Sequence, residues 1–109
     1  MQINFENFSQ FKILIGTIIS VSNNEGARNP AYVLDIDFGE ELGIKKTSAQ
    51  IKDYDLEELE GRQVVAVTNF PSKNIAGIIS EVLVLGAVTN EGVKLIGTEV
   101  KVENGTAIG

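Results

Sequence analysis

Hydrophobic and polar residues alternate along residues 31–38, where the sequence reads AYVLDIDF. An alternation of period two is typical of a β-strand that buries one face in a core. The face expected to be buried carries Tyr32, Leu34, Ile36 and Phe38. The opposite face carries Val33, Asp35 and Asp37. The pattern predicts a strand here, joined by a tight turn at GEEL to a second strand.

Apolar runs elsewhere in the chain also predict strands. Residues 11–24 are rich in β-branched side chains and end in Ser-Asn-Asn, which indicates a strand and then a turn. Gly16 inside this strand indicates a bulge or a sharp bend. Residues 62–70 (RQVVAVTNF) predict a strand buried on both faces. Residues 80–97 predict a strand and a hairpin that turns at TNEG, and residues 98–109 a short strand and a turn.

Two short helices are expected between these strands and before them. Asn4 is a suitable N-cap for a turn or two of helix near the start of the chain. The segment DYDLEELEG predicts a second helix, capped by Asp53 or Asp55 and ended by Gly61. Five or six short strands with a helix after the third favour a small Greek-key barrel of the OB type, with an unclosed β-sandwich as the main alternative.

Composition narrows the chemistry that this domain can perform. The 109 residues fit a single domain, and they include no cysteine and no histidine. Disulfides and thiolate chemistry are therefore excluded, zinc and other cofactors are not expected, and general acid–base catalysis would fall to carboxylates, lysines or tyrosines. We expect a non-catalytic, cytoplasmic protein, because neither a secretory signal nor a membrane-spanning run is evident.

The charge balance argues against nucleic acid as a general partner. Fifteen acidic residues face nine basic ones, for a net charge of −6. Binding to phosphates needs cations that displace counterions, although a local basic patch can exist on an acidic protein. Asp35, Asp37, Glu40 and Glu41 form an acidic cluster that could hold a hard cation. A solvated polar strand face is the favoured interpretation of this cluster, and no metal site is expected.

The stretch NFPSKNIAGIISEVLVLG, residues 69–86, begins as a lysine-bearing loop and ends as an apolar strand. Together with GIKKTSAQI and GRQVVAV, it closely resembles the tRNA-binding domain of bacterial CsaA-type export chaperones. Relatives of that domain include free-standing tRNA-binding proteins and the C-terminal domain of bacterial methionyl-tRNA synthetases. The similarity extends from about Phe8 to Gly109, almost the whole chain.

The resemblance implies an OB barrel with short N- and C-terminal additions that pair two barrels into a homodimer. Residues 1–109 would form one domain, with a short N-terminal helix over 1–11, the barrel over 12–97 and a C-terminal extension over 98–109. Three aromatic residues of the N-terminal addition could stack on bases, but dimer packing is the favoured role: Phe5, Phe8 and Phe11. Members of the family are similar to proteins that hold the tRNA elbow, and the CsaA branch is also associated with unfolded or preprotein chains.

Carried onto this sequence, the family pattern gives a set of candidate RNA-binding residues: Lys45, Lys46, Ser48, Gln50, Asn69, Lys73 and Ser80. Lys45 and Lys46 are adjacent on one strand and point to opposite faces, so at most one is expected to contact RNA. Ser80 and Gln50 could instead cap strand ends. Asn69 is favoured as a turn former ahead of Pro71.

The chain also departs from the family at basic positions. Leu14 replaces an arginine of the first strand, and Asn29 and Val33 replace two lysines, so that only Arg28 remains in that segment. Ile75 to Gly77 replace the usual IGP. Each lost phosphate contact lowers the affinity for RNA at physiological salt. The alternative function is therefore an export-related chaperone that binds unfolded or preprotein segments, with weak or lost tRNA binding.

Overall fold

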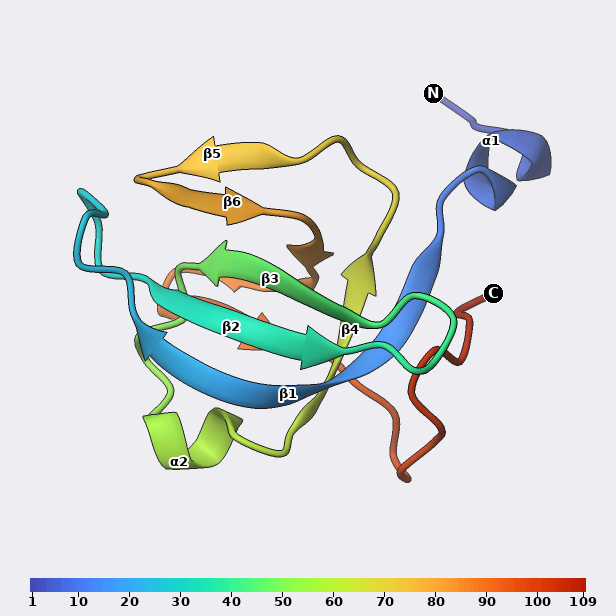
Figure 1. Cartoon of the computed structure of the whole chain (residues 1–109). Helices are drawn as coiled ribbons and strands as arrows, with labels where there is room; N and C mark the ends of the chain where they lie inside the picture. Colours follow the sequence, from blue (N-terminus) through green and yellow to red (C-terminus); the bar gives the residue numbers. More distant parts are fainter.

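The computed structural model describes residues 1–109 and consists mainly of β-strands (Figure 1). The helices are α1 (Phe5–Ser9) and α2 (Leu56–Leu59). The strands are β1 (Ile13–Asn23), β2 (Tyr32–Asp37), β3 (Ile44–Ala49), β4 (Gln63–Val67), β5 (Lys73–Ile75), β6 (Ile78–Ser80), β7 (Leu83–Val84), β8 (Gly86–Thr89) and β9 (Gly92–Leu95). Neither helix has the length and apolar character needed to cross a lipid bilayer.

Five of the strands form one antiparallel sheet in the order β3-β2-β1-β4-β7. The long strand β1 makes this order possible, because its first half pairs with β4 and its second half with β2. The sheet curls until its edges meet. There the Glu81 amide donates to the Lys46 carbonyl over 2.8 Å, and the Thr47 hydroxyl donates to the Val82 carbonyl over 2.8 Å. The fold is therefore a nearly closed, all-β, OB-like barrel, as predicted, and not an open sandwich.

The predicted alternation of β2 is confirmed by the core. Tyr32, Leu34, Ile36 and Phe38 all belong to the central cluster of buried side chains. Strand β4 is buried along Val64–Val67, as the continuous apolar run predicted. Leu59 of α2 completes the cluster beside β1, with Asp55 as the helix N-cap. The division into a single domain with short terminal additions stays a prediction.

The expectation of a bulge at Gly16 was wrong, whereas a bend of the strand there stays a prediction. The register shift of β1 against β2 lies between Ile18 and Ser20. A Cβ atom at Gly16 would lie 2.6 Å from Ile36 Cγ2 and 2.7 Å from Phe38 Cδ1. The glycine is therefore required because the Phe38 ring packs directly on the β1 backbone, which a sequence pattern of one strand cannot reveal.

The segment predicted as a loop before an apolar strand is instead a β-hairpin. Strands β5 and β6 pair antiparallel, with Ala76 at φ +50° and Gly77 at φ +88° between them. Two central residues with positive φ match the twist of paired strands, and this turn type is the favoured one for a two-residue connection. The apolar strand that follows is correspondingly short, because the chain leaves the sheet after β7. Leu83 remains 49% exposed, and only Val82 next to it is buried.

The C-terminal segment lies along the part of β1 that β2 leaves unpaired. The Ile15 amide donates to the Thr106 carbonyl over 2.9 Å, and the Ile108 amide donates to the Ile13 carbonyl over 2.9 Å. The predicted final strand is reduced to a single bridge between Leu14 and Ala107. Helix α1 and the C-terminus therefore lie on the same side of the barrel (Figure 1).

Candidate nucleic-acid interface

Three segments meet at one end of the barrel: the β1–β2 loop, the end of β3, and the tip of the β5–β6 hairpin (Figure 1). The approach of loop and hairpin is close. A Cβ atom at Gly26 would lie 2.9 Å from the Ala76 carbonyl oxygen. Glycine at this position allows the β1–β2 loop to rest directly on the turn of the hairpin.

Asn24 ties the three segments together. Its side chain is only 7% exposed, and its Nδ2 donates to Ser48 Oγ over 3.0 Å and to the Ile75 carbonyl over 3.4 Å. The backbone amide of Asn24 donates to the Ala31 carbonyl over 2.9 Å, and this bond joins the two ends of the β1–β2 loop. Sequence reasoning missed this residue. Its only signal was an asparagine at the end of an apolar strand, which also suits an ordinary turn.

A cavity of about 250 Å³ opens between the loop and the hairpin, and we call it the rim pocket. Its lining combines polar and apolar side chains: Ala27, Arg28, Asn29, Ala31, Ser48, Gln50, Ile75 and Ala76. A second cavity of about 190 Å³ adjoins it and shares Ser48, Gln50 and Ile75. The structure thus brings two of the predicted RNA-binding residues, Ser48 and Gln50, to one site together with Arg28.

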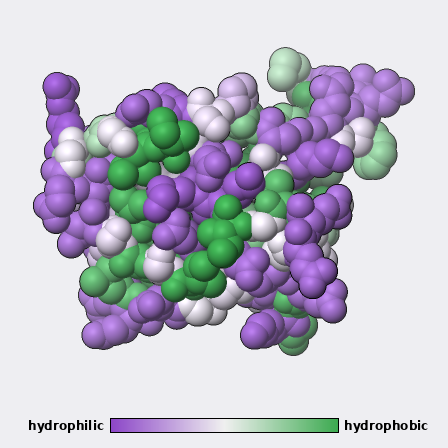
Figure 2. Space-filling model, in the orientation of Figure 1, coloured by the Kyte–Doolittle hydropathy of each residue, from purple (hydrophilic) through white to green (hydrophobic).

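Lys73 lies on β5 and is exposed. It is on the same face of the strand as Ile75, because side chains two apart point the same way. Lys73 borders a further cavity of about 520 Å³, which we call the apolar groove and which is also lined by Phe70, Pro71, Val82 and Leu83. Figure 2 shows hydrophobic side chains gathered around this hairpin, with hydrophilic ones beside them. Lys73 therefore borders the apolar groove, and Ile75, two residues along β5, lines both this groove and the rim pocket.

Ser80 is buried, with 8% of its surface exposed. Its Oγ lies 2.7 Å from Thr47 Oγ1 and accepts from the Ser48 amide over 3.3 Å. These contacts join β6 to β3 where the sheet closes. The hydroxyl of Ser80 therefore has a structural role already, and its contact with RNA stays a prediction.

The two adjacent lysines of β3 have different surroundings. Lys46 Nζ lies 3.0 Å from Asp35 Oδ1 on the outer face of the barrel, and Ser20 Oγ donates to Asp35 Oδ2 over 2.7 Å. Hydrogen bonding from Ser20, opposed in part by desolvation and assisted by Lys46, holds the pKa of Asp35 below its ordinary value. Lys45 is partly buried and takes the other face of the strand, as strand alternation requires.

The two aspartates of the acidic cluster, Asp35 and Asp37, bond to different partners within the protein. Asp35 is engaged by Ser20 and Lys46, and Asp37 Oδ1 accepts from the Gly39 amide over 2.8 Å. No group of three or more acidic side chains in the structure is placed to hold a metal ion. The carboxylates of β2 thus serve the sheet and its turn.

Asn69 is not part of the rim. Its Oδ1 accepts from the Lys12 amide over 2.9 Å, and its Nδ2 donates to the Gln10 carbonyl over 2.8 Å. Both ends of the side-chain amide therefore hold the segment that links α1 to β1. This is a structural role, though a different one from the turn expected ahead of Pro71.

The N-terminal aromatic residues present apolar surface to solvent. Phe5 is 80% exposed, and Phe11 packs edge-on against Phe70 with the ring centroids 6.5 Å apart and the planes at 85°. Phe8, one turn away in α1, is partly buried. Figure 2 shows hydrophobic atoms standing out from the N-terminal region at the upper right. We refer to Phe5, Phe8 and Phe11 with Phe70 as the aromatic patch.

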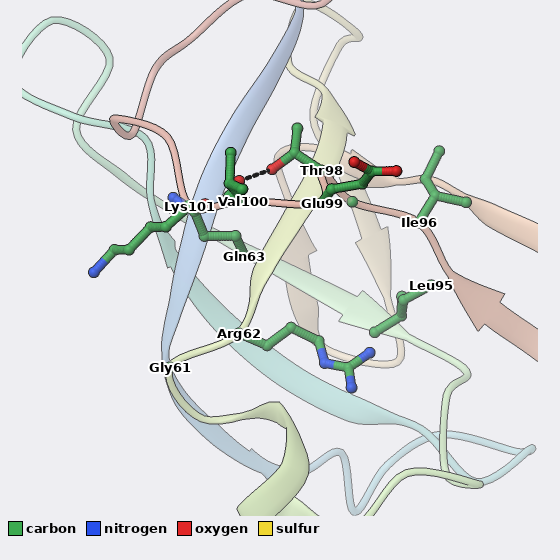
Figure 3. A pocket seen from close by; sticks show the side chains of 10 residues that line it. Gly61, Arg62, Gln63, Leu95, Ile96, Thr98, Glu99, Val100 and Lys101 are labelled. Carbon is green, nitrogen blue, oxygen red and sulfur yellow. Dashed lines mark hydrogen bonds between the residues drawn. The ribbon is translucent and has the colours of Figure 1, made fainter.

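The remaining basic side chains are dispersed. Lys52 Nζ lies 4.3 Å from the centre of the Tyr32 ring and contacts Asn23 Oδ1, beside the start of the β1–β2 loop. Arg62 stacks on Tyr54 at 4.9 Å and borders a cavity of about 450 Å³ next to the C-terminal segment (Figure 3). Lys101 also borders this cavity but points away from it (Figure 3). Arg28 is the one basic residue that lines the rim pocket.

Comparison with solved structures gives close matches to the entire chain. The CsaA chaperone of Picrophilus torridus superimposes with a TM-score of 0.95 at 46% identity, covering 99% of this chain and 100% of that one. The CsaA chaperone of Bacillus anthracis superimposes with a TM-score of 0.93 at 47% identity, covering all of both chains.

Sequence relatives are much longer proteins. The methionine–tRNA ligase of Pyrococcus abyssi is 32% identical over 113 aligned residues, which is 99% of this chain but 15% of the ligase. The chain thus spans about 15% of the length of the curated relatives that it matches. Residues 13–107 match the family described as "Putative tRNA binding domain". This match covers nearly the whole barrel and its C-terminal segment, so the chain belongs to the tRNA-binding domain family and is of the CsaA type.

Proposed function

We propose that this protein binds structured RNA, with tRNA as the physiological partner, through the rim of its barrel. The observation that carries the proposal is the convergence of Arg28, Ser48, Gln50 and Lys73 around one end of an OB-like barrel in a tRNA-binding family. Loops at this end of OB barrels are the ones that bind oligonucleotides. No nucleophile or paired acid and base is needed for such a function, so we propose binding without catalysis.

The residues of the predicted set have two kinds of role in this proposal. Lys73, Gln50 and Ser48 contact RNA directly, together with Arg28. The other three residues stabilise the barrel and do not contact RNA. Ser80 bonds to Thr47, Asn69 bonds to the backbone of residues 10–12, and Lys46 pairs with Asp35. Lys45 faces away from Lys46 and is the one of the pair that we assign to RNA.

A titration with bulk tRNA tests the proposal. We expect a gel-shift complex at micromolar protein that weakens as salt is raised, since neutralised phosphates release counterions. Three cations are assigned to RNA: Arg28, Lys45 and Lys73. If all three contact phosphates of paired RNA, the logarithm of affinity falls against that of salt with a slope of about −2.7. A complex that is absent, or insensitive to salt, contradicts the proposal.

We also propose a homodimer formed through the aromatic patch. An exposed Phe5 and a half-exposed Phe11 and Phe70 on one terminal region are the kind of apolar surface that a partner covers. Light scattering should give twice the monomer mass for the wild type and the monomer mass for Phe5→Ser with Phe11→Ser. Ile79→Ser, a matched change at an exposed residue of the β5–β6 hairpin, should leave the dimer intact.

A second candidate function is the holding of unfolded or preprotein chains. The apolar groove favours it, because Phe70 and Leu83 present nearly half of their surface to solvent there. Suppression of aggregation of a denatured client, reduced by Leu83→Ser, would support this function. If tRNA competes with the client, one surface serves both, since Lys73 borders the groove. If tRNA has no effect, the two surfaces are separate.

A further inference from the structure

We propose that the rim pocket receives the base of one unpaired nucleotide and distinguishes among bases, and this inference rests on the proposed binding of RNA. It identifies which part of the RNA enters the site. The three features that lead to it are the amide side chains lining the pocket, its small volume of about 250 Å³, and the single cation in its lining.

The chemistry of the lining suits a base edge. Gln50 and Asn29 each offer an amide with two donors and an acceptor, the groups that pair with the edges of bases. Arg28 adds a planar guanidinium on which a base can stack. Ile75 and Ala76 supply an apolar surface for the base faces. A phosphate alone would need only the cation, so the amides indicate recognition of a base.

The size of the pocket suits a single base. The cavity of about 250 Å³ lies between the β1–β2 loop and the hairpin tip and falls below the range of about 300–1,000 Å³ usual for drug-sized ligands. In double-stranded RNA the major groove is too deep and narrow for side chains to reach the base edges. A base can enter only when it has left the helix, as it does in loops, bulges and single strands.

Lys73 is placed to bind a phosphate of the RNA chain where the chain continues beyond the rim pocket. Lys73 is two residues from Ile75 on the same face of β5, which places its backbone about 7 Å further along the strand. A phosphate next to the inserted nucleotide would then contact Lys73, while the guanidinium of Arg28 stacks on the base. Base recognition and phosphate binding can therefore be measured separately. Gln50 determines the preference among bases, and Lys73 determines the dependence of affinity on salt.

Contacts within the protein hold the walls of the rim pocket in place. Asn24 fixes Ser48 and the hairpin carbonyl at the same time, and Gly26 rests on Ala76. Walls held in this way reduce the entropy lost on binding and make small differences between bases measurable.

The test uses the full chain and four fluorescent RNA hexamers, each of a single base, beside a blunt RNA duplex of six base pairs. We expect the wild type to prefer the best homopolymer over the worst by about tenfold, the discrimination of one good amide contact, and to bind the duplex more weakly than the best homopolymer. Gln50→Leu, which keeps the approximate size without the amide, should reduce the spread to about twofold. Gln50→Glu should change the ranking, because it replaces donors with acceptors.

Lys73→Ala is the matched comparison. It should weaken all four homopolymers by a similar factor, keep their ranking, and lower the salt slope by about 0.7. The inference is overturned if tRNA binds but the four homopolymers bind equally, if Gln50→Leu leaves their ranking and spread unchanged, or if the duplex binds as tightly as the best hexamer. If wild-type protein binds neither tRNA nor any hexamer, the proposed function fails as well. The two failures are thus distinguished by the tRNA measurement.

Discussion

The ammonium of Lys46 lies 3.0 Å from the carboxylate of Asp35, across the outer face of two paired strands. The neighbouring register pairs, Asp35 with Lys46 and Ser20 with Asp35, continue this line of polar contacts over three strands. Lys46 is therefore partly neutralised, even though it is one of the two lysines in the family motif GIKKTSAQI. We therefore expect Lys46, whose charge is offset by Asp35, to contribute less to RNA binding than an unpaired lysine would.

A first prediction concerns Lys46 itself. Lys46→Met should change the affinity for tRNA by less than about twofold, since the acid partner already offsets the charge. Lys45→Met, the matched change at the adjacent position, should lower the affinity more. Filter binding of both variants at one salt concentration checks this. A larger loss from Lys46→Met than from Lys45→Met would show that the lysine exchanges Asp35 for a phosphate.

The lowered pKa of Asp35 predicts a dependence of stability on pH. A carboxyl whose pKa is lower in the folded protein adds stability above its unfolded pKa, near the ordinary value of 3.8, and loses it as the pH falls through the folded pKa. Asp35→Asn should therefore cost up to about 1 kcal/mol at pH 7, and wild type and variant should converge below pH 3.8.

Urea unfolding at several pH values measures this difference. Ser20→Ala is the control, because it removes the largest cause of the shift and should bring the pKa of Asp35 closer to its ordinary value. A stability difference that persists unchanged at acid pH would assign the effect of Asp35→Asn to packing instead.

The buried hydroxyls of Thr47 and Ser80 predict a cost in stability at the seam of the barrel. Thr47→Val preserves the shape but removes the hydroxyl that bonds to the Val82 carbonyl and leaves Ser80 Oγ with the Ser48 amide alone, which should cost about 1–3 kcal/mol. Thermal or urea unfolding checks this value. Ser80→Ala should also lower stability; if it instead lowered tRNA affinity at unchanged stability, Ser80 would be a direct RNA contact.

The hydrogen bonds of Asn24 lead us to predict that the β5–β6 hairpin must be held in place for tRNA to bind. Asn24→Ala removes the bonds to Ser48 and to the Ile75 carbonyl, so the β5–β6 hairpin should exchange its amide hydrogens faster. The affinity for tRNA should fall by about tenfold, at a cost in stability of about 1–2 kcal/mol. Hydrogen exchange localised by mass spectrometry checks the first point. Unchanged exchange in residues 73–80 would show that the hairpin holds its place without Asn24.

The sequence predicted correctly those elements whose pattern depends on neighbouring residues in the chain. The alternation over Tyr32 to Phe38 placed the core face of β2, and the apolar run of Val64 to Val67 placed the buried strand β4. Asn4 was correctly identified as a helix cap, and Asp55 is the one of the two candidates, Asp53 and Asp55, that caps α2. Each of these depends on neighbours within a few positions, which is where sequence patterns are informative.

The contacts that depend on distant segments were not predictable. Gly16 is set by Phe38, more than twenty positions away in the chain, and Asn69 is held by the backbone near Lys12. The β5–β6 hairpin was missed because Ala76 adopts a positive φ that glycine or asparagine would have signalled. The family motif supplied Lys73 and Gln50, whereas Asn24 and the role of Arg28 at the rim pocket emerged only from the packing of two loops.

The most direct test of RNA binding at the rim compares Lys73→Ala with Lys101→Ala in tRNA titrations at increasing salt. Both variants lose one positive charge, but Lys73 borders the apolar groove on the β5–β6 hairpin and Lys101 borders the cavity of the C-terminal segment. We predict that Lys73→Ala weakens the complex and lowers the salt slope by about 0.7 to 0.9, whereas Lys101→Ala changes neither. Equal effects of the two substitutions would mean that tRNA responds only to the overall charge of the protein, and would contradict a binding site at the rim.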